Sequence, residues 1–311
     1  AYRVLPILIE NTRPMKRRSS EIMAALPAPI QGATWMVLSG FFFTGAAASV
    51  RYLSTDIHFI QISFFRAIFG ILLMLPWLMS VGLVAMRTRQ TGRYIARSTV
   101  SVGANLCWFA ALGMMSIADA TALSFITPIF ITIAAMVLLR EKSGVKRWIG
   151  LLVGFAGTAI ILRPGVAEMN VGAMWVLASA VLFAGSALFV KVLARHDRPD
   201  TITLYQLLYM LPINFIPSLF VWVWPTGEQW VWAVMIGVLT TVAQRCYTRA
   251  YAAADASAIQ PFDFLRLPFA VLLGFILFAE WPDMWSVMGG VVIFGSSIFV
   301  AHGEAWKNKT P

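Results

Sequence analysis

Long apolar segments alternate with short polar ones along almost the whole chain. A helix needs about twenty residues to cross the hydrocarbon core of a bilayer, and ten segments come close to that length. They cover residues 30–50, 59–84, 94–115, 119–139, 145–162, 171–194, 201–224, 229–252, 255–279 and 284–302. The shortest joints, at 116–118, 253–254 and 280–283, separate runs that would be too long for one crossing if they were joined. The pattern predicts an all-α integral membrane protein with ten transmembrane helices.

The first predicted span is repeated in the sixth, 140 residues later. Residues 32–48 and 172–188 share the matched pairs Gly32/Gly172, Ala33/Ala173, Trp35/Trp175, Ser39/Ser179, Phe43/Phe183, Gly45/Gly185 and Ala47/Ala187. At an offset of 139, the sequence from Asn105 to Trp108 aligns with that from Gln244 to Tyr247. An apolar chain built from two matching halves is typical of secondary transporters, which bind their substrate where the halves meet.

Positively charged residues gather in alternate joints. Of the 24 Lys and Arg residues, 18 lie within 3–18, 87–97, 140–147, 191–198 and 307–309, which would all be on one side of the membrane. Cytoplasmic loops carry an excess of Lys and Arg, so we predict that both termini are cytoplasmic. The same asymmetry accounts for the net charge of +10 without a nucleic-acid partner.

The two halves should enter the membrane from opposite sides, because each contains an odd number of spans. The joint at 140–147 is basic, whereas its repeat mate at 280–283 carries no positive charge, which places the two on opposite faces. We therefore predict two inverted five-helix repeats. The expected organisation is a cytoplasmic N-terminal segment at 1–29, a first repeat at 30–162, a second repeat at 170–302 and a cytoplasmic tail at 303–311.

The composition argues against several other classes of protein. Hydrophobic residues make up 59% of the chain and charged residues 12%, whereas soluble domains have about 25% charged residues. The two cysteines lie inside apolar segments, so we expect no disulfide framework, and no Cys/His cluster suggests a metal or another cofactor. No Gly-x-Ser-x-Gly or His-Glu-x-x-His motif occurs. We expect no enzymatic activity. We expect the protein to contact membrane lipid and to be compatible with a monomeric state.

Scattered motifs within these spans carry a family resemblance. Arg66 lies within Ser-Phe-Phe-Arg-Ala, and Glu141 and Gly150 are nine residues apart, as are their repeat mates Glu280 and Gly289. With ten spans and an inverted repeat, this resembles the drug/metabolite transporter superfamily, specifically the group built from two EamA-type repeats. The resemblance covers residues 30–302 and extends to the aromatic amino acid exporter branch. It implies that the first four spans of each repeat surround a central cavity, with the fifth at the periphery.

The ninth span carries the most polar face inside the predicted membrane region. A charged residue near the middle of a span costs roughly 2.5–3.5 kcal/mol, so Asp263 and Arg266 require a reason. They are three residues apart and share a helix face, between Pro261 and Pro268. The pair either contacts an amino group and a carboxylate of the substrate or ties this helix to its neighbours. An Asp held by Arg is a poor proton carrier, which favours facilitated diffusion or exchange.

Three further Arg residues lie within predicted spans. Arg66 is roughly 12 Å deep at 1.5 Å per residue, where a carboxylate, backbone carbonyls or a lipid phosphate would be its partner. Arg245 is a candidate second cation in the cavity, and Arg249 lies nearer the cytoplasmic end, where its side chain can reach the interface.

Matched carboxamides and deep aromatic residues complete the candidate site. Asn105 and Gln244 occupy equivalent positions near the midplane, where they would either bind substrate or form helix–helix hydrogen bonds. Aromatic rings beside them could stack on an apolar or aromatic substrate. The predicted cavity-lining residues are Asn105, Trp108, Tyr205, Gln244, Tyr247, Asp263 and Arg266.

These observations predict a bacterial inner-membrane transporter that works by alternating access. The resemblance implies export of small metabolites, most of all amino acids of the aromatic or neutral type. Two alternatives remain open: an importer of a nucleoside-like or cofactor-like metabolite and, in a different class, an intramembrane enzyme.

Overall fold

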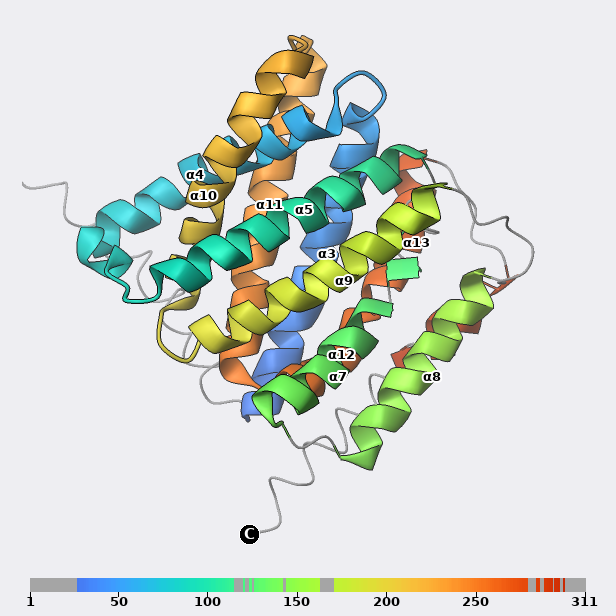
Figure 1. Ribbon diagram of the computed structural model, residues 1–311. Coiled ribbons are helices and arrows are strands. Elements are labelled where there is room, and N and C mark those ends of the chain that lie inside the picture. The colour runs from blue at the N-terminus through green and yellow to red at the C-terminus, as the bar shows by residue number, and fades with distance from the viewer. Residues whose placement is uncertain are drawn as a thin grey trace, which may run out of the picture.

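The computed structural model describes residues 27–114, 120, 123–124, 126–141, 144–162, 171–278, 284–285, 288–292, 294–296 and 299. Within these residues the regular structure is entirely helical, and the helices form one bundle (Figure 1). They are α3 (Ala28–Leu53), α4 (Phe59–Val81), η1 (Leu83–Met86), α5 (Thr91–Met114), α7 (Ile126–Leu139), α8 (Val145–Leu162), α9 (Val171–Leu193), α10 (Pro199–Ser218), η2 (Leu219–Val221), α11 (Gly227–Ala253), α12 (Ala256–Asp263) and α13 (Arg266–Phe278).

The helices follow the predicted spans closely. Among the residues described above, five segments are long and apolar enough to cross a membrane: Ala28–Leu53, Phe59–Val81, Val171–Leu193, Pro199–Val221 and Ala258–Leu277. Helices α5 and α11 have 24 and 27 residues but are more polar, since they carry Asn105 and Gln244 together with several Arg residues. The predicted joint at 253–254 is confirmed by the end of α11 at Ala253. The joints at 116–118 and 280–283, both termini and part of the tenth span lie outside the described residues.

Contacts between the halves occur in exchanged pairs, as a two-fold relation requires. Helix α3 packs along α11, and its counterpart α9 packs along α5. The pair α4 and α11 corresponds in the same way to α10 and α5, while α4 contacts its own counterpart α10. Figure 1 shows α5 and α9 running side by side across the bundle, with α8 at its edge. This arrangement buries the seam between the halves at the centre of the molecule.

A turn of the same shape ends the first helix of each half. In the first half the amides of Ser54 and Ile57 donate to the carbonyls of Val50 and Leu53, at 2.8 and 2.9 Å. In the second half Ala194 and Asp197 donate to Val190 and Leu193 at the same two distances. Each position differs from its counterpart by 140 residues, so the sequence repeat reappears as a repeat of backbone hydrogen bonds.

The predicted ninth span is two helices rather than one. Helix α12 ends at Asp263 and α13 begins at Arg266, with a turn between them. Pro268, in the first turn of α13, has no N–H with which to continue the hydrogen-bond ladder of an uninterrupted helix. Discontinuous helices of this kind are found in transporters where the backbone borders a cavity, and here the break lies beside the cavity described below.

A glycine permits a close approach of α11 to α4. A Cβ atom added to Gly237 of α11 would lie 2.3 Å from Cβ of Phe69 on α4. Only a residue without a side chain therefore fits at this crossing, which fixes the spacing of two helices that border the cavity.

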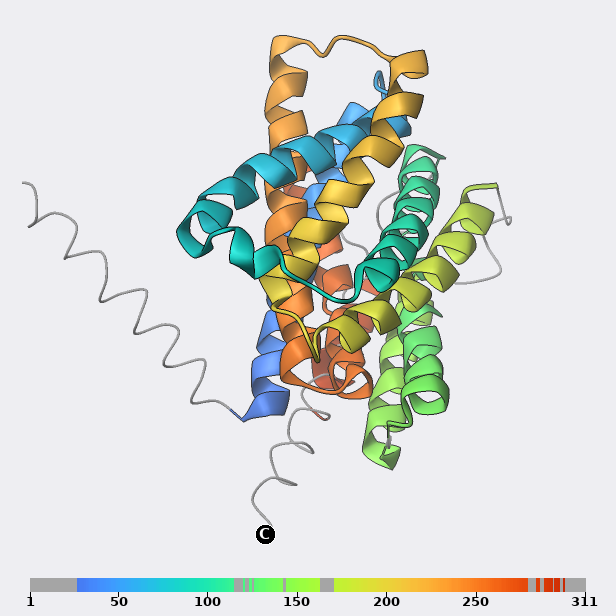
Figure 2. The same cartoon turned by 60° about the vertical axis from the view of Figure 1, so that its left-hand side comes forward.

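Figure 2 shows the connection from α10 through η2 to α11 at one end of the bundle.

Candidate functional site

A cavity lies at the seam between the two halves. It encloses about 1070 Å³ of space free of atoms, with any adjoining open solvent counted. Its walls come from α3, α4, α5, α7, α9, α10, α11, α12 and α13, together with Ser124, whereas none of the described side chains of α8 lines it. The described lining residues are Phe43, Thr44, Ala46, Ala47, Val50, Arg66, Arg97, Ser101, Asn105, Trp108, Phe109, Ser124, Thr127, Ile131, Phe183, Ser186, Gln206, Thr240, Gln244, Tyr247, Gln260, Asp263 and Arg266.

The structure brings six of the seven sequence-predicted residues to this cavity. The six that line it are Asn105, Trp108, Gln244, Tyr247, Asp263 and Arg266. The repeat partners Asn105 and Gln244 reach it from α5 and α11, which occupy equivalent places in the two halves. Trp108 and Tyr247 follow each of them by three residues and so reach the same wall.

The prediction that Tyr205 lines the cavity is wrong, since Tyr205 is not among the described lining residues. Its hydroxyl donates to the backbone carbonyl of Met86 at 2.5 Å. Its ring lies against those of Tyr94 and Tyr209, with centroids 4.5 and 5.9 Å away. Residues of one helical turn share a face, but the face that carries Tyr205 points toward the start of α5 rather than toward the seam.

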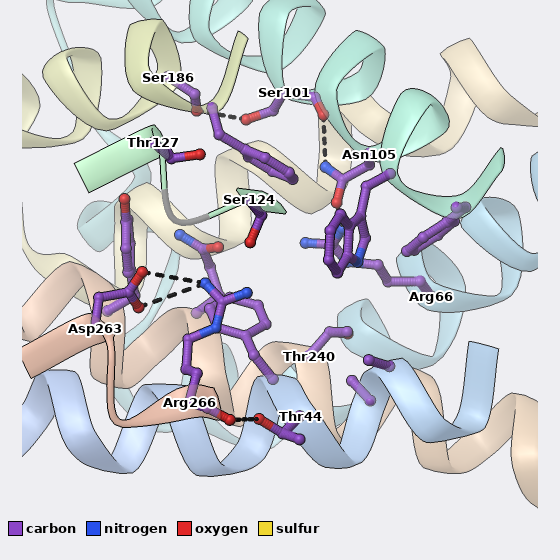
Figure 3. A pocket seen from close by; sticks show the side chains of 18 of the residues that line it. Thr44, Arg66, Ser101, Asn105, Ser124, Thr127, Ser186, Thr240, Asp263 and Arg266 are labelled. Atoms are coloured by element: carbon purple, nitrogen blue, oxygen red, sulfur yellow. Dashed lines mark hydrogen bonds and ion pairs between the residues drawn. The ribbon is translucent and has the colours of Figure 1, made fainter. Parts of the chain in front are cut away.

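Asp263 and Arg266 form an ion pair at one side of the cavity (Figure 3). Arg266 Nη1 lies 3.3 Å from Asp263 Oδ2, and the side chains are 23% and 14% exposed. The stem of Arg266 fills the space beside Gly40 of α3, where an added Cβ would lie 2.5 Å from its Cγ. The hydroxyl of Thr44, also on α3, donates to the Arg266 carbonyl at 3.4 Å. The pair thus has access to the cavity and is held in place by α3.

A hydrogen-bonded chain borders the cavity away from that ion pair (Figure 3). Arg66 Nη1 donates to the carboxamide oxygen of Asn105, and Asn105 Nδ2 donates to the Ser101 carbonyl at 2.5 Å. The hydroxyl oxygens of Ser101 and Ser186 lie 2.6 Å apart. Arg66 is 4% exposed. The chain links α4, α5 and α9, so it ties the first half to the second and fixes the Asn105 side chain.

Gln244 differs from Asn105 in having an uncommitted donor. Its Nε2 atom is buried and has no hydrogen-bond partner in the described structure. Nearby, Tyr247 and Gln260 both donate to the hydroxyl oxygen of Tyr251, at 3.0 and 2.7 Å. Buried amides without a partner are rare, so the free N–H of Gln244 is available to a ligand in the cavity.

Arg97 is a cavity residue that the sequence interpretation missed. It was assigned to a cytoplasmic joint, but α5 begins at Thr91 and Arg97 is only 1% exposed. Its Nη1 donates to the Ile202 carbonyl at 3.2 Å and its Nη2 to Gln206 Oε1 at 2.7 Å. The i, i+4, i+8 spacing of Arg97, Ser101 and Asn105 on one helix face is the sequence signal that could have revealed it.

The remaining intramembrane cations lie outside the cavity. Arg245 Nε and Arg249 Nη2 contact the carboxylate of Asp200, in the first turn of α10, at 2.7 and 2.8 Å. The Arg249 guanidinium also lies 5.5 Å from the ring centroid of Trp35 on α3. The prediction of Arg245 as a cavity cation is therefore wrong, and these groups instead join α10, α11 and α3. Lys191, assigned to a joint, is likewise buried and donates to the Ala254 carbonyl at 2.5 Å.

Aromatic side chains form much of the apolar wall. Phe43, Trp108, Phe109, Phe183 and Tyr247 all line the cavity. The rings of Phe43 and Tyr247 meet edge to face, with centroids 6.3 Å apart. A flat aromatic ligand would find stacking surfaces here and hydrogen-bond donors on the same wall. Phe43 and Phe183 are also repeat partners, 140 residues apart.

The profile of the EamA-like transporter family matches the chain twice, over residues 30–163 and 170–301. The riboflavin transporter of Rhizobium johnstonii is 35% identical over 96% of this chain and 100% of its own length. The riboflavin transporter of Vibrio cholerae is 34% identical over 90% of this chain and 96% of its own length.

A solved crystal structure of a protein with 17% sequence identity superposes with a TM-score of 0.73, covering 89% of this chain and 99% of that one. At this identity the likeness concerns the fold alone. With the two profile matches and the membrane-length helices, the fold is an all-α membrane protein of ten transmembrane helices, arranged as two inverted five-helix repeats around a central cavity.

Proposed function

The chain belongs to the EamA-like transporter family, and from this premise we propose that it carries riboflavin or a closely related flavin across the bacterial inner membrane. The observation that supports this proposal most is the identity of 35% and 34% to two riboflavin transporters, over nearly the whole of each protein. In this proposal the chain is a small-molecule transporter without a catalytic role of its own. The units at 30–162 and 170–302 are its two repeats, and both termini are cytoplasmic.

The chemistry of the cavity is suited to a flavin. The isoalloxazine ring is flat and aromatic, and the lining offers Trp108, Phe183 and Tyr247 for stacking. Its carbonyl oxygens require donors, which Gln244 supplies through an Nε2 atom that lacks a protein partner. Its ribityl hydroxyls require acceptors, for which the Asp263 carboxylate is available.

Amino acid export is a second candidate, favoured by one specific observation. A carboxylate and a guanidinium, those of Asp263 and Arg266, lie 3.3 Å apart at the cavity wall. The ammonium and carboxylate groups of an amino acid are complementary to such a pair. In this candidate the aromatic wall would hold the side chain of the amino acid, as predicted for the aromatic amino acid exporter branch.

We further propose that the flux follows the substrate gradient without proton coupling. Asp263 is the single acidic residue among the described residues that line the cavity, and it is ion-paired with Arg266. Alternating access then needs only the relative motion of the two repeats around the cavity.

Counterflow in liposomes tests these proposals together. Purified protein would be reconstituted into vesicles preloaded with unlabelled riboflavin or phenylalanine, and entry of the labelled compound would be followed with and without a pH gradient. We expect saturable riboflavin counterflow that is independent of the gradient and is not inhibited by phenylalanine. Phenylalanine counterflow without riboflavin counterflow would favour the amino acid candidate, and gradient-dependent flux would contradict uncoupled transport.

A further inference from the structure

Positive charges outnumber negative ones among the described residues that line the cavity. Three guanidinium groups line it, those of Arg66, Arg97 and Arg266, against the single described carboxylate of Asp263. Arg266 is paired with that carboxylate. Within the part of the chain that the structure describes, the hydrogen-bond partners of Arg66 and Arg97 are neutral, namely the amide oxygens of Asn105 and Gln206 and the carbonyl of Ile202. A charge buried away from water is costly without a counter-charge, so these two guanidinium groups favour an anion in the cavity that they line.

The donors of these two residues are not saturated. A guanidinium has five N–H donors, and the Nε atoms of both Arg66 and Arg97 are buried without a hydrogen-bond partner in the described structure. Both side chains are more than nine-tenths buried, at 4% and 1% exposed. Neighbouring helices hold them in place, because Arg66 on α4 is hydrogen-bonded to Asn105 on α5, and Arg97 on α5 is hydrogen-bonded to Gln206 on α10. Arginine is the residue best matched to the oxygens of carboxylate and phosphate groups.

We infer that Arg66 and Arg97 form an oxyanion subsite of the central cavity, which receives a phosphate or carboxylate group. The inference rests on the proposed flavin transport for the identity of the molecule that carries this group. In that setting the aromatic wall holds the isoalloxazine ring, and the Arg pair receives a phosphate at the end of the ribityl chain. The cavity then accepts flavin mononucleotide in preference to riboflavin. A free anion bound beside a neutral flavin satisfies the same chemistry.

Binding to the full-length protein in lipid nanodiscs tests the subsite. Titration with riboflavin, with flavin mononucleotide, and with each in the presence of inorganic phosphate would be read from flavin fluorescence. We expect flavin mononucleotide to bind at least about tenfold more tightly, which corresponds to one additional charged hydrogen bond, and phosphate to compete with it. If the anion is instead a free one, phosphate will tighten riboflavin binding. Equal affinities with no effect of phosphate would overturn the inference.

Substitutions separate the subsite from a general effect of charge. Arg66→Gln and Arg97→Gln should each reduce the preference for flavin mononucleotide to about twofold or less, while riboflavin affinity changes far less. Arg97→Lys keeps the charge but loses the forked donor geometry, so it should retain part of the preference. Arg249→Gln is the matched control, because Arg249 is ion-paired with Asp200 outside the cavity. A preference that survives in both Gln variants would contradict the inference.

Thermal unfolding distinguishes failure of the subsite from failure of the proposed function. Phosphate should raise the unfolding temperature of the wild-type protein and of Arg249→Gln, and should have no effect on Arg66→Gln or Arg97→Gln. If no flavin binds but phosphate stabilises in this residue-dependent way, flavin transport is wrong and the oxyanion subsite stands. If riboflavin binds and phosphate has no effect in any variant, the subsite is wrong and flavin transport stands.

Discussion

Arg266 reaches across the break between α12 and α13 to lie 3.3 Å from Asp263. Both residues line the cavity, so the pair connects two helical segments at the point where the backbone is least regular. The side chains are 23% and 14% exposed, and solvent in the cavity weakens their attraction relative to a fully buried pair. In the proposed function, this exposure allows the two side chains to exchange their mutual contact for one with a substrate.

A double-mutant cycle on this pair should reveal modest coupling. Asp263→Asn and Arg266→Gln each leave one charge without its partner, so each should destabilise the protein more than the double variant does. After allowance for screening, we expect a coupling of about 1 kcal/mol. Chemical denaturation in detergent measures it, with Arg93→Gln on the exposed face of α5 as a control. Strictly additive effects would show that the pair contributes no stability.

Gln244→Ala should impair transport while leaving folding intact. The Nε2 atom of Gln244 has no protein partner, so its removal breaks no donated bond within the described structure. We expect flux to fall about tenfold, the effect of losing one substrate hydrogen bond, with stability changed by less than about 0.5 kcal/mol. Unchanged flux in a well-folded variant would remove Gln244 from the binding site.

Gln61→Ala is the matched comparison for Gln244→Ala. The Gln61 side chain donates to the Val223 carbonyl at 2.6 Å and accepts from the Val223 amide at 3.0 Å. It is fully buried, and its loss leaves two backbone groups unpaired, so stability should fall by about 2 kcal/mol. The two substitutions are chemically identical, so opposite effects on stability and flux would separate a structural amide from a binding one.

Gly237→Ala should be strongly destabilising. The added methyl group would lie 2.3 Å from Cβ of Phe69, which cannot move without shifting the backbone of α4. Overpacking of this kind costs about 1–3 kcal/mol, and the yield of folded protein should fall accordingly. Gly227→Ala is the control, because an added Cβ there, at the start of the same helix, meets open space. Equal stability of both variants, measured by thermal unfolding, would contradict the close crossing.

Asp200→Ala should expose Cys246 to thiol reagents. Asp200 holds Arg245 and Arg249, which flank Cys246 on α11, and Cys246 is only 6% exposed. Loss of the carboxylate leaves two like charges side by side and loosens α10 from α11. We expect maleimide labelling of Cys246 to accelerate several-fold, with Cys107 on α5 as an internal reference. A labelling rate equal to that of the wild-type protein would mean that other contacts keep these helices together.

The sequence predicts the cavity best where the repeat and the helical period agree. Asn105 and Gln244 were found because matched positions in inverted halves must both face the seam. Asp263 and Arg266 were found because a charge pair on one face of an apolar helix has few alternatives to a cavity. The flanking prolines marked this segment as irregular, although the pattern did not show that it divides into two helices at residues 264–265.

Tertiary partners explain what the sequence did not reveal. Arg97 lies near the start of its helix, where hydropathy favours an exposed charge, but Ile202 and Gln206 supply acceptors more than 100 residues away in the chain. Tyr205 has the depth of a cavity residue, yet its orientation is set by Tyr94 and by the carbonyl of Met86. Hydrophobic periodicity predicts which residues share one face of a helix. It does not predict which other element packs against that face, because this depends on the tertiary structure.

The exchanged contacts between α3 and α11 and between α9 and α5 have a consequence for biogenesis. Each half finds its main packing partners in the other half, so the first helices to leave the ribosome must wait in the lipid until the eighth span is synthesised. During that interval the polar faces of α3 and α5 lack their native neighbours and depend on lipid, water or the insertion machinery. The same dependence implies that two separately expressed halves should assemble with each other in the membrane, because the main packing contacts of each described half are with the other half.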